Sequence, residues 1–349
     1  MRVFFSTILC LFSYSILQAT TFHVNNQTGT SDGANGIYAE IQDAHDVALD
    51  GDTIIVDGTP NLYQSPNISK RLVIMGPGYF QNENPNTNTF PASIRTINLR
   101  QATRGDVNSG AAGSVVQGFD FGEQFSGGID IDVNNTIVRK NRIKFVNIQW
   151  STVADDQVRN TIISQNYFVD NGNNSHIQNS FRGIIQDAII RNNIFEGIIT
   201  IPEFSKLDFL NNVVINPQFS IENINGVVRN NVFLSNSPTY ALSADSVTHN
   251  ISLGAGLPSG NGNITNAQSG NIFVLSPINN GTDGQYRLNT NSLALGSGYQ
   301  GTDIGPFGGT SPYIVYGIGE MPVIWFLNVS SPIDPGQNLP ILIRAVSGS

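Results

Sequence analysis

The hydrophobic and polar positions between residues 187 and 253 form a repeat centred on an asparagine. Short apolar runs lie on both sides of it, as in IIRNNIFEG and VVRNNVFLS. The central asparagines follow one another at a constant interval of 19 residues and are Asn193, Asn212, Asn231 and Asn250. A period near 20 residues that joins two short apolar runs is typical of stacked β coils, in which each coil packs on its neighbours. We therefore expect a β-solenoid.

The same arrangement extends beyond this stretch in both directions. TIVRKNRIKF, TIISQNYFVD and SGNIFVL place Asn141, Asn166 and Asn271 at the position of the repeated asparagine. The first two steps of the series are 25 and 27 residues, longer than the regular step. We expect the additional residues to leave the stack as loops over residues 150–156 and 171–179. Loops of this kind commonly line the binding face of a solenoid.

The repeated asparagines are predicted to serve the fold rather than a ligand. Asparagine tolerates the left-handed backbone of a sharp bend, and its amide bonds to nearby backbone groups. Stacked asparagines also bond to one another and satisfy buried groups that would otherwise cost about 1–3 kcal/mol each. The predicted asparagine ladder consists of Asn141, Asn166, Asn193, Asn212, Asn231, Asn250 and Asn271.

One helix is predicted ahead of the repeats. Apolar residues recur at helical spacing within residues 38–49, and Gly51 lies where the end of a helix is expected. The apolar positions of this helix are Ile41, Ala44, Val47 and Ala48. A helix at this place would cover the open end of the stack, which otherwise presents an unpaired apolar cross-section. Strands are predicted at residues 21–24, 53–56, 72–75, 94–99, 115–121 and 129–133.

Two segments resemble the two ends of exported right-handed parallel β-helix proteins of the pectate-lyase-like superfamily. The first carries the pattern IQ-A--A--GDTI-V--G-Y in Ile41, Gln42, Ala44, Ala48, Gly51, Asp52, Thr53, Ile54, Val56, Gly58 and Tyr63. The second carries Y-L---S-A-G-G---DIG-GG in Tyr286, Leu288, Ser292, Ala294, Gly296, Gly298, Asp303, Ile304, Gly305 and Gly309. The resemblance implies an all-β fold, a right-handed parallel β-helix over residues 20–309 with the first segment as its cap and the second as its closing coil. It implies no particular activity.

The two ends of the chain carry different signals. Arg2, an apolar stretch over residues 3–17 and Ala19 predict a secretory signal peptide over residues 1–19, with a membrane anchor as the alternative. We expect a secreted or extracytoplasmic protein with no membrane span in the mature chain. Residues 310–349 alternate apolar and polar positions around a turn, which predicts a C-terminal β element that caps the last coil. A strand-swapping or partner-docking tail is the alternative.

Composition narrows the class of partner. Charged residues make up 12% of the chain, against about 25% in an average globular protein, while hydrophobic residues reach 40%. This balance argues against disorder, which goes with few aliphatic residues and much charge. The net charge of −9 without a basic run argues against nucleic acid as a partner. Cys10, the sole cysteine, lies in the predicted signal, so the mature chain would have no disulfide.

Candidate chemistry is sparse, and its strongest element is a carboxylate pair. In GIDID, alternation turns Ile129 and Ile131 inward and places Asp130 and Asp132 on one outer face, about 7 Å apart. The pair is a candidate Ca²⁺ site or catalytic pair if further oxygen ligands are supplied. Neighbouring strands force no second acidic residue beside it, so two solvated carboxylates are the simpler interpretation. No cofactor is required by any motif.

Arg142 and Lys144 are the other catalytic candidates. Together with Ile143 they spell the substrate-binding triplet of polygalacturonases, but the other motifs of that family are missing, and its aspartates come before the triplet rather than after it. We interpret the match as coincidence and expect a local basic spot that includes Arg139 and Lys140. The four histidines are not at metal-binding spacing.

Two aromatic residues beside the predicted loops, Trp150 and Tyr167, are candidates for stacking on a sugar, with core packing as the alternative. The leading hypothesis is a secreted β-helix protein that binds extracellular polysaccharide and, if an enzyme, acts as a polysaccharide lyase or glycoside hydrolase. The alternative is a non-catalytic cell-surface structural or adhesion solenoid. An ice- or surface-binding solenoid is a weaker third hypothesis, because flat Thr-x-Thr ladders are absent from the sequence.

Overall fold

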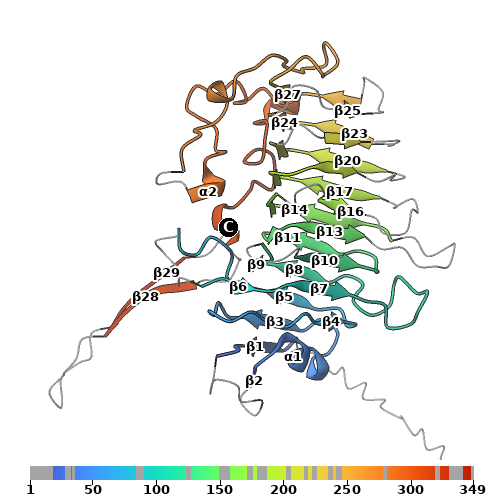
Figure 1. Cartoon of the computed structure of the whole chain (residues 1–349), viewed down its shortest axis with the longest axis vertical. Helices are drawn as coiled ribbons and strands as arrows, with labels where there is room; N and C mark the ends of the chain where they lie inside the picture. Colours follow the sequence, from blue (N-terminus) through green and yellow to red (C-terminus); the bar gives the residue numbers. More distant parts are fainter. Residues whose placement is uncertain are drawn as a thin grey trace, which may run out of the picture.

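The protein is predominantly β and is built from long parallel sheets. A computed structural model describes residues 19–27, 33, 36–83, 90–122, 127–148, 158–170, 176–178, 187–201, 206–215, 219–221, 226–234, 239–240, 246–277, 281–318, 323–329 and 341–346. Figure 1 shows the strands stacked in one column, from the N-terminal helix α1 at one end to β27 at the other. The predicted signal peptide lies outside the described residues, apart from Ala19.

The longest sheet has eleven strands and forms the first face of the stack. In hydrogen-bonded order these are β2 (Ile37–Tyr38), β1 (Thr21–Val24), β3 (Thr53–Val56), β5 (Val73–Met75), β8 (Val115–Gln117), β11 (Ile137–Arg139), β14 (Thr161–Ser164), β17 (Ala188–Arg191), β20 (Leu207–Leu210), β23 (Gly226–Arg229) and β26 (Val247–Thr248).

The second face is an eight-stranded sheet of two-residue strands. In order these are β27 (Ile251–Ser252), β24 (Val232–Phe233), β21 (Val213–Val214), β18 (Ile194–Phe195), β15 (Tyr167–Phe168), β12 (Arg142–Ile143), β9 (Phe119–Asp120) and β6 (Ala92–Ser93).

The third face consists of two shorter sheets. One has five strands, in the order β16 (Ile177–Gln178), β13 (Phe145–Ile148), β10 (Gly128–Ile131), β7 (Thr96–Leu99) and β4 (Asn67–Ile68). The other has three, in the order β19 (Ile199–Ile201), β22 (Phe219–Ile221) and β25 (Thr239–Tyr240).

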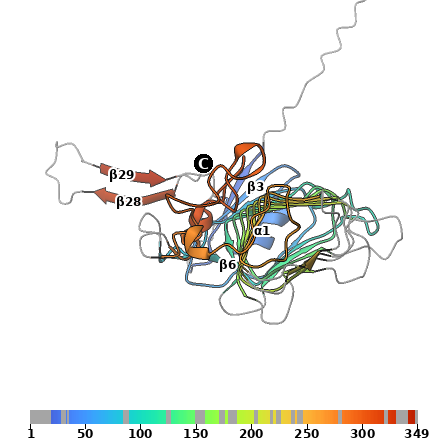
Figure 2. The ribbon, with the colours of Figure 1, turned by 90° about the horizontal axis from the view of Figure 1, so that it is seen from above.

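The chain visits these faces in a fixed cycle, and we call one passage through them a coil. β11, β12 and β13 form one coil, and each pairs in parallel with the equivalent strand of the next, as in β11 with β14. Figure 2 looks along the stack and shows the successive coils lying over one another. The arrangement is compatible with a parallel β-solenoid, as the asparagine repeat predicts.

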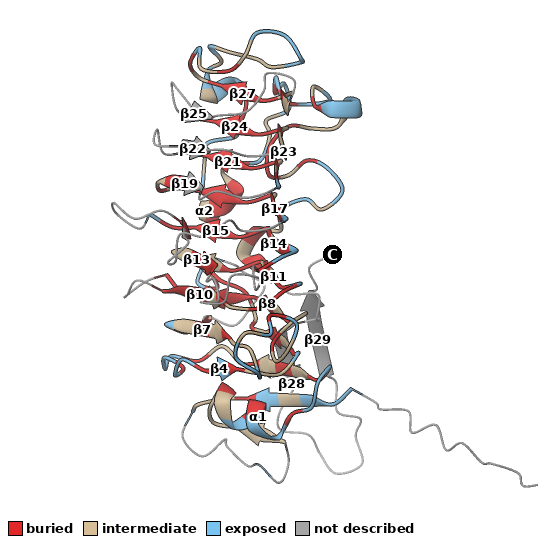
Figure 3. Cartoon of the chain, turned by 90° about the vertical axis from the view of Figure 1, so that its right-hand side faces the viewer, coloured by how far each residue is buried: buried red, intermediate tan, exposed pale blue. Residues whose placement is uncertain are grey.

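Alternation along the strands fills the interior with apolar side chains. In β3 and β7 every second residue is buried, so that Ile54, Val56, Ile97 and Leu99 point inward. The buried apolar residues inside the stack form one continuous hydrophobic cluster, and a second cluster includes the outer residues Ile194, Val213, Val232 and Ile251 of the second face. Figure 3 shows the buried residues in red along the stack. Burial of apolar area on this scale, at about 25 cal/mol per Å², is the main stabilising contribution to a fold of this kind.

The bend between the first and second faces holds the asparagine ladder. Six of the seven predicted residues occupy it and are fully buried: Asn141, Asn166, Asn193, Asn212, Asn231 and Asn250. The Oδ1 atom of Asn166 accepts from the backbone N–H and the Nδ2 of Asn141, at 3.0 and 3.2 Å. Its Nδ2 donates to the carbonyl of Val138 at 2.9 Å and to Oδ1 of Asn193 at 3.1 Å. Each amide is thus saturated by its neighbours.

Two parts of the ladder prediction are wrong. Asn271 lies exposed in the 3₁₀ turn η3 (Ser269–Asn271), and the ladder ends instead at Asn263, whose Oδ1 accepts from Asn250. The last coil takes only 13 residues to return to the bend, which hides this member from a search for a period of 19. The left-handed backbone lies one residue earlier than predicted, at Lys140, Gln165, Asn192, Asn211, Asn230 and His249.

Helix α1 (Ile41–Val47) packs against the first coil and covers its apolar end. Its buried residues are Ile41, Ala44 and His45, followed by Ala48 at the end of the helix. These follow the spacing i, i+3, i+4, i+7, which lies on one side of a helix. Val47 was expected on this side but falls off the stripe and is 52% exposed.

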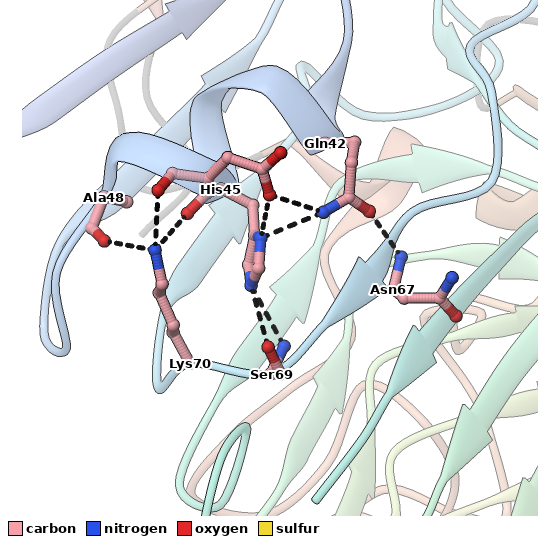
Figure 4. A network of polar contacts seen from close by, with 7 residues as sticks. Gln42, His45, Ala48, Asn67, Ser69 and Lys70 are labelled. Carbon is pink, nitrogen blue, oxygen red and sulfur yellow. Dashed lines mark hydrogen bonds and ion pairs between the residues drawn. The ribbon is translucent and has the colours of Figure 1, made fainter. Parts of the chain in front are cut away.

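His45 fixes the helix to the second coil (Figure 4). Its Nε2 accepts from the backbone N–H of Ser69 at 3.1 Å, so its proton is on Nδ1 and is donated to Asp46 at 2.9 Å. The Lys70 ammonium donates to the carbonyls of His45, Asp46 and Ala48 at 2.8–2.9 Å. A cation at the C-terminal carbonyls of a helix is favourable because those groups have no partner within the helix.

Residues 281–318 do not form the predicted closing coil. They include α2 (Gly281–Gly284), η4 (Tyr299–Gly301) and η5 (Val315–Gly317), and we call them the return segment. The segment runs back along the bends that hold the ladder. The side-chain amides of Asn211 and Asn192 donate to carbonyls of residues 303–308, and that of Gln165 donates to the Pro312 carbonyl. Leu257 joins the core beyond the last coil.

A buried polar cluster holds the far end of the return segment. Asp283 accepts from the Tyr313 hydroxyl at 3.0 Å and from the backbone N–H of Tyr316 at 2.7 Å. The hydroxyls of Tyr313 and Tyr79 are hydrogen-bonded, which ties the segment to an early coil. Burial raises the pKa of Asp283 to about 7.

The remaining elements are β28 (Val323–Val329) and β29 (Ile341–Val346), which form a separate two-stranded antiparallel sheet. Residues 310–318 lie along the flank of the stack, so this part of the predicted C-terminal cap does not cover the last coil. For residues 319–349 the capping element stays a prediction. Within the described residues, no helix is long and apolar enough to cross a membrane.

Candidate functional site

The outer face of the five-stranded sheet carries a column of polar residues in register. Asn67, Asn98, Asp130 and Asn147 are paired positions of β4, β7, β10 and β13. Adjacent strands of a sheet lie about 4.8 Å apart, so side chains at paired positions form a regular row. We call Asn98, Asp130 and Asn147 the polar column.

Alternation places these side chains outside because their neighbours are inside. Ile97 and Leu99 on β7 are fully buried, as are Ile129 and Ile131 on β10. Asn98, Asp130 and Asp132 therefore lie on the outer face, which agrees with the orientation that the sequence predicts for the two aspartates.

Arg100 joins the carboxylate pair. Its guanidinium lies 2.6 Å from Oδ2 of Asp132 and 3.6 Å from Oδ2 of Asp130. It also donates to Oδ1 of Asn98 at 3.0 Å. A cation of the chain itself thus stands where the sequence suggests a Ca²⁺ ion. The described residues contain no group of three or more His, Cys, Asp or Glu side chains that would hold a metal.

Further hydrogen bonds hold the column in place. Nδ2 of Asn147 donates to Oδ1 of Asp130 at 2.9 Å, and Nδ2 of Asn98 donates to the carbonyl of Pro66 at 3.3 Å. Oδ1 of Asp132 is buried without a partner, and burial raises the pKa of this carboxyl above its usual range. The column is thus a connected, preorganised row of donors and acceptors.

An aromatic ring borders the column. Phe145 is partly exposed and is in register with Gly128, two residues before Asp130. A Cβ on Gly128 would lie 2.6 Å from the Phe145 ring, so the ring covers this glycine and any larger residue would displace it. A partly exposed apolar ring beside a row of amides and carboxylates can contact a ligand that has both C–H faces and hydroxyl groups.

Arg142 and Lys144 do not form the predicted basic spot with Arg139 and Lys140. Arg142 is on β12, where its guanidinium contacts both carboxylate oxygens of Asp120 at 3.1 Å. Arg139 belongs to the first face and donates to Gln117 at 2.7 Å, and Lys140 occupies the bend after it. Lys144 lies at the next bend. Arg139 and Lys140 line one pocket, whereas Arg142 lies on the second face and Lys144 beyond it, so the four residues form no single basic spot.

Tyr167 does not offer a ring to a sugar. It is 1% exposed, its hydroxyl donates to Glu196, and its ring contacts Tyr79 and Phe80. The packing alternative is therefore the correct one for this residue. Trp150, the other aromatic candidate, lies outside the described residues, as does most of each predicted loop.

The histidines that the structure describes have structural roles where they are buried. His176 donates from Nδ1 to the Lys144 carbonyl at 2.7 Å and accepts the Gly197 N–H at 2.8 Å. Burial lowers its pKa to about 4. Ser69, His45 and Asp46 lie in the order of a hydrolase triad, with Ser69 Oγ 3.4 Å from His45 Nε2. The backbone N–H of Ser69 already uses that nitrogen as its acceptor, so His45 is poorly placed to activate the hydroxyl.

Four residues of the site are not predicted from the sequence: Asn98, Arg100, Asn147 and Phe145. Alternation in TINLR would have placed Asn98 and Arg100 on an outer face. Alternation does not predict that Asn98 and Arg100 lie beside Asp130 and Asp132, because the register of β7 with β10 depends on how many residues leave the stack between the two strands.

Comparisons with known proteins add no family. No protein-family model matches the chain, and no curated protein or solved structure matches it.

Proposed function

We propose that the chain is an exported right-handed parallel β-helix protein that binds an extracellular polysaccharide along the polar column. The resemblance of residues 41–63 to the cap and first coil of pectate-lyase-like proteins supports this fold. The parallel sheets, the capping helix and the stacked coils are consistent with it. Fold alone does not assign a ligand, so the proposal rests on the outer face of the five-stranded sheet.

The observation that carries the proposal is the row formed by Phe145 and the polar column. A polysaccharide presents sugar rings at regular intervals, and a sheet presents side chains at regular intervals of about 4.8 Å. Amide and carboxylate groups bond to hydroxyls, and the ring of Phe145 packs on C–H faces. The hydrogen bonds within the column fix these groups before the ligand arrives, which lowers the cost of binding.

Binding without cleavage is the better-supported form of this proposal. Asp130 and Asp132 are both paired with Arg100, and Arg142 is paired with Asp120, so three of the four catalytic candidates are engaged in ion pairs with other side chains of the chain. A calcium-dependent reaction would require Arg100 to leave the carboxylates. Ca²⁺ binding by this pair therefore remains a separate hypothesis that the same experiment examines.

The test is retention of the secreted protein in gels that contain acidic or neutral polysaccharides, with CaCl₂ or with EDTA. We expect retention by at least one polysaccharide that is unchanged by EDTA, and no ultraviolet absorbance from unsaturated products. Phe145→Ala and Asn98→Ala should weaken retention about tenfold, which corresponds to about 1.4 kcal/mol. Thr248→Ala, an outward position on the first face, is the matched control and should bind normally.

Two results would overturn the proposal. Retention by no polysaccharide in the panel would favour the second candidate, a structural or adhesion solenoid. The buried asparagine ladder also fits this candidate, because its amides stabilise the stack of coils. Release of unsaturated product that depends on Ca²⁺ and is lost in Asp130→Ala would show a lyase instead.

A further inference from the structure

A cleft of about 280 Å³ lies at the bend between the eight-stranded and five-stranded sheets. It is lined by the corresponding bends of three successive coils, at residues 59–62, 90–95 and 120–122. The backbone N–H of Tyr63 donates to the backbone carbonyl of Ser93 at 2.9 Å, and that of Ile94 donates to the backbone carbonyl of Asp120 at 3.0 Å. Because hydrogen bonds between coils hold its walls, the cleft exists before any ligand enters.

One wall of the cleft is apolar and open to solvent. Leu62 and Phe90 are 46% and 41% exposed, and Pro60 and Pro91 stand beside them. The position of Phe90 is set by Gly58, where a Cβ would come within 1.9 Å of the Phe90 carbonyl oxygen. The glycine thus allows the two loops to approach closely enough to form this wall.

The opposite wall is polar and includes a buried carboxylate. Asp120 is held by the Arg142 guanidinium at 3.1 Å and by the backbone N–H of Gly122 at 2.8 Å. A Cβ on Gly122 would lie 3.1 Å from that guanidinium, so the absence of a side chain there leaves space beside the ion pair. Ser93 and Arg95 also line the cleft.

We propose that this cleft is a second binding site, which accepts a single hexopyranose ring. Pockets for small ligands combine apolar walls with a few fixed polar groups, and the volume here suits one sugar unit rather than a chain. The C–H face of the ring packs on Phe90 and Leu62, while its hydroxyls face Asp120, Ser93 and Arg95. The fixed ion pair supplies an acceptor whose orientation does not change on binding.

The cleft is separate from the polar column. Arg95 stands immediately before β7, at the bend, whereas Asn98 lies farther along that strand on the next face. The cleft is therefore a distinct site for a free sugar, a chain end or a branch, and it does not require that a polymer lie along the column. The two sites have no side chain in common, so variants of each can be examined independently.

The experiment is saturation-transfer NMR, followed by calorimetry, on the full chain with glucose, galactose, mannose and galacturonate. We expect at least one sugar to bind with a Kd on the order of 1 mM, as befits a ligand of this size. Phe90→Ala and Leu62→Ala should each weaken binding about tenfold, and Gly122→Val should abolish it by filling the cleft. Leu62→Ala changes an exposed side chain and protects the test from a folding defect. Leu293→Ala, which removes an equally exposed leucine elsewhere, should have no effect.

The variants show whether a sugar binds in the cleft or on the polar column. Loss of sugar binding in the cleft variants, with Asn98→Ala binding normally, supports the cleft whether or not the column binds a polysaccharide. Binding that is lost in Asn98→Ala and retained in Phe90→Ala would place the sugar on the column and overturn the proposal. Binding of an aromatic alcohol such as benzyl alcohol without any of the four sugars would show an apolar pocket of another kind.

Discussion

Two columns of polar side chains run along this molecule, and they differ in what surrounds them. The ladder from Asn141 to Asn263 lies inside a bend, where backbone groups and neighbouring amides take up every donor and acceptor. The polar column lies on the outer face of a sheet, where its groups bond to one another and to Arg100, and where Asn98 and Asp130 are partly exposed.

The difference shows that residue type and stacking do not by themselves indicate a site. An asparagine enclosed by backbone contributes to the fold, because its loss leaves buried groups without partners. An asparagine that is partly exposed on an outer strand position, as Asn98 is, can also bond to a ligand. Position relative to the bend therefore separates the two roles.

The largest effect is expected from removing a rung of the ladder. Asn212→Ala would leave the backbone N–H of Asn193 and the carbonyl of Ile190 without their partners. At about 1–3 kcal/mol for each buried group, with a cavity in addition, the free energy of unfolding should fall by about 3–6 kcal/mol. Urea denaturation measures this change.

Asn271→Ala is the matched control for that substitution. Asn271 continues the same sequence pattern but is exposed, so its loss should change stability by less than about 0.5 kcal/mol. Equal losses in the two variants would contradict the distinction between buried and exposed asparagines.

The free energy of unfolding should depend on pH through the carboxyl that holds the return segment, whereas the ladder asparagines do not titrate. Burial raises the pKa of Asp283 from 3.8 to about 7 in the folded state. Its stabilising effect is therefore complete below about pH 4 and is lost as pH rises through 7, by up to about 4 kcal/mol. His176 acts in the opposite direction, because its folded pKa of about 4 lies below its usual value and costs stability as pH falls below 6.5.

Comparison with Asp283→Asn isolates the contribution of the carboxyl. The amide keeps an acceptor for Tyr313 and Tyr316 but does not ionise. We expect this variant to be more stable than the natural chain at pH 8, with the advantage shrinking toward pH 5. A difference that stays constant across this range would show that Asp283 does not titrate there.

A smaller effect is expected at Arg100, where the outer column can be turned into a different site. Arg100→Gln removes the cation between Asp130 and Asp132, and because Arg100 is partly exposed the stability loss should be about 1 kcal/mol. The two carboxylates then have no counter-ion and should bind Ca²⁺, which calorimetry would detect in the variant alone. Calcium binding of equal strength by the natural chain would show that the ion displaces Arg100.

The smallest effect on the fold is expected in the column itself. Asn98→Ala should change the unfolding free energy by only about 0.5 kcal/mol, because the Pro66 carbonyl still accepts from the backbone N–H of residue 98 and the Arg100 guanidinium still pairs with Asp132. The same substitution should weaken polysaccharide binding about tenfold. Destabilisation as large as that of Asn212→Ala would mean that the polar column, like the ladder, mainly stabilises the fold.

The sequence predicts the strands and the ladder well because both depend on patterns within short stretches of the chain. The predicted bounds of β1 and β3 agree with the structure at both ends of each strand, and the asparagine period locates the bend that holds the ladder. Asn263 was missed because the coil length changes there from 19 to 13 residues. The return segment was missed because the resemblance of residues 286–309 implies a closing coil. The outward placement of Asp130 and Asp132 follows from alternation, but their pairing with Arg100 depends on register across loops. Periodicity within one strand carries no information on that register.

The return segment has a mechanical consequence. In a stack of coils that touch only their neighbours, the last coil can peel away alone. Here residues 299–317 follow the bends from Asn230 back to Lys140, so the chain leaves the body beside an early coil rather than at the end. Tension applied beyond Ile318 would first load the hydrogen bonds of Tyr313 with Tyr79 and Asp283. The force would thus act on the side of the stack, and the return segment would have to detach before the later coils are loaded.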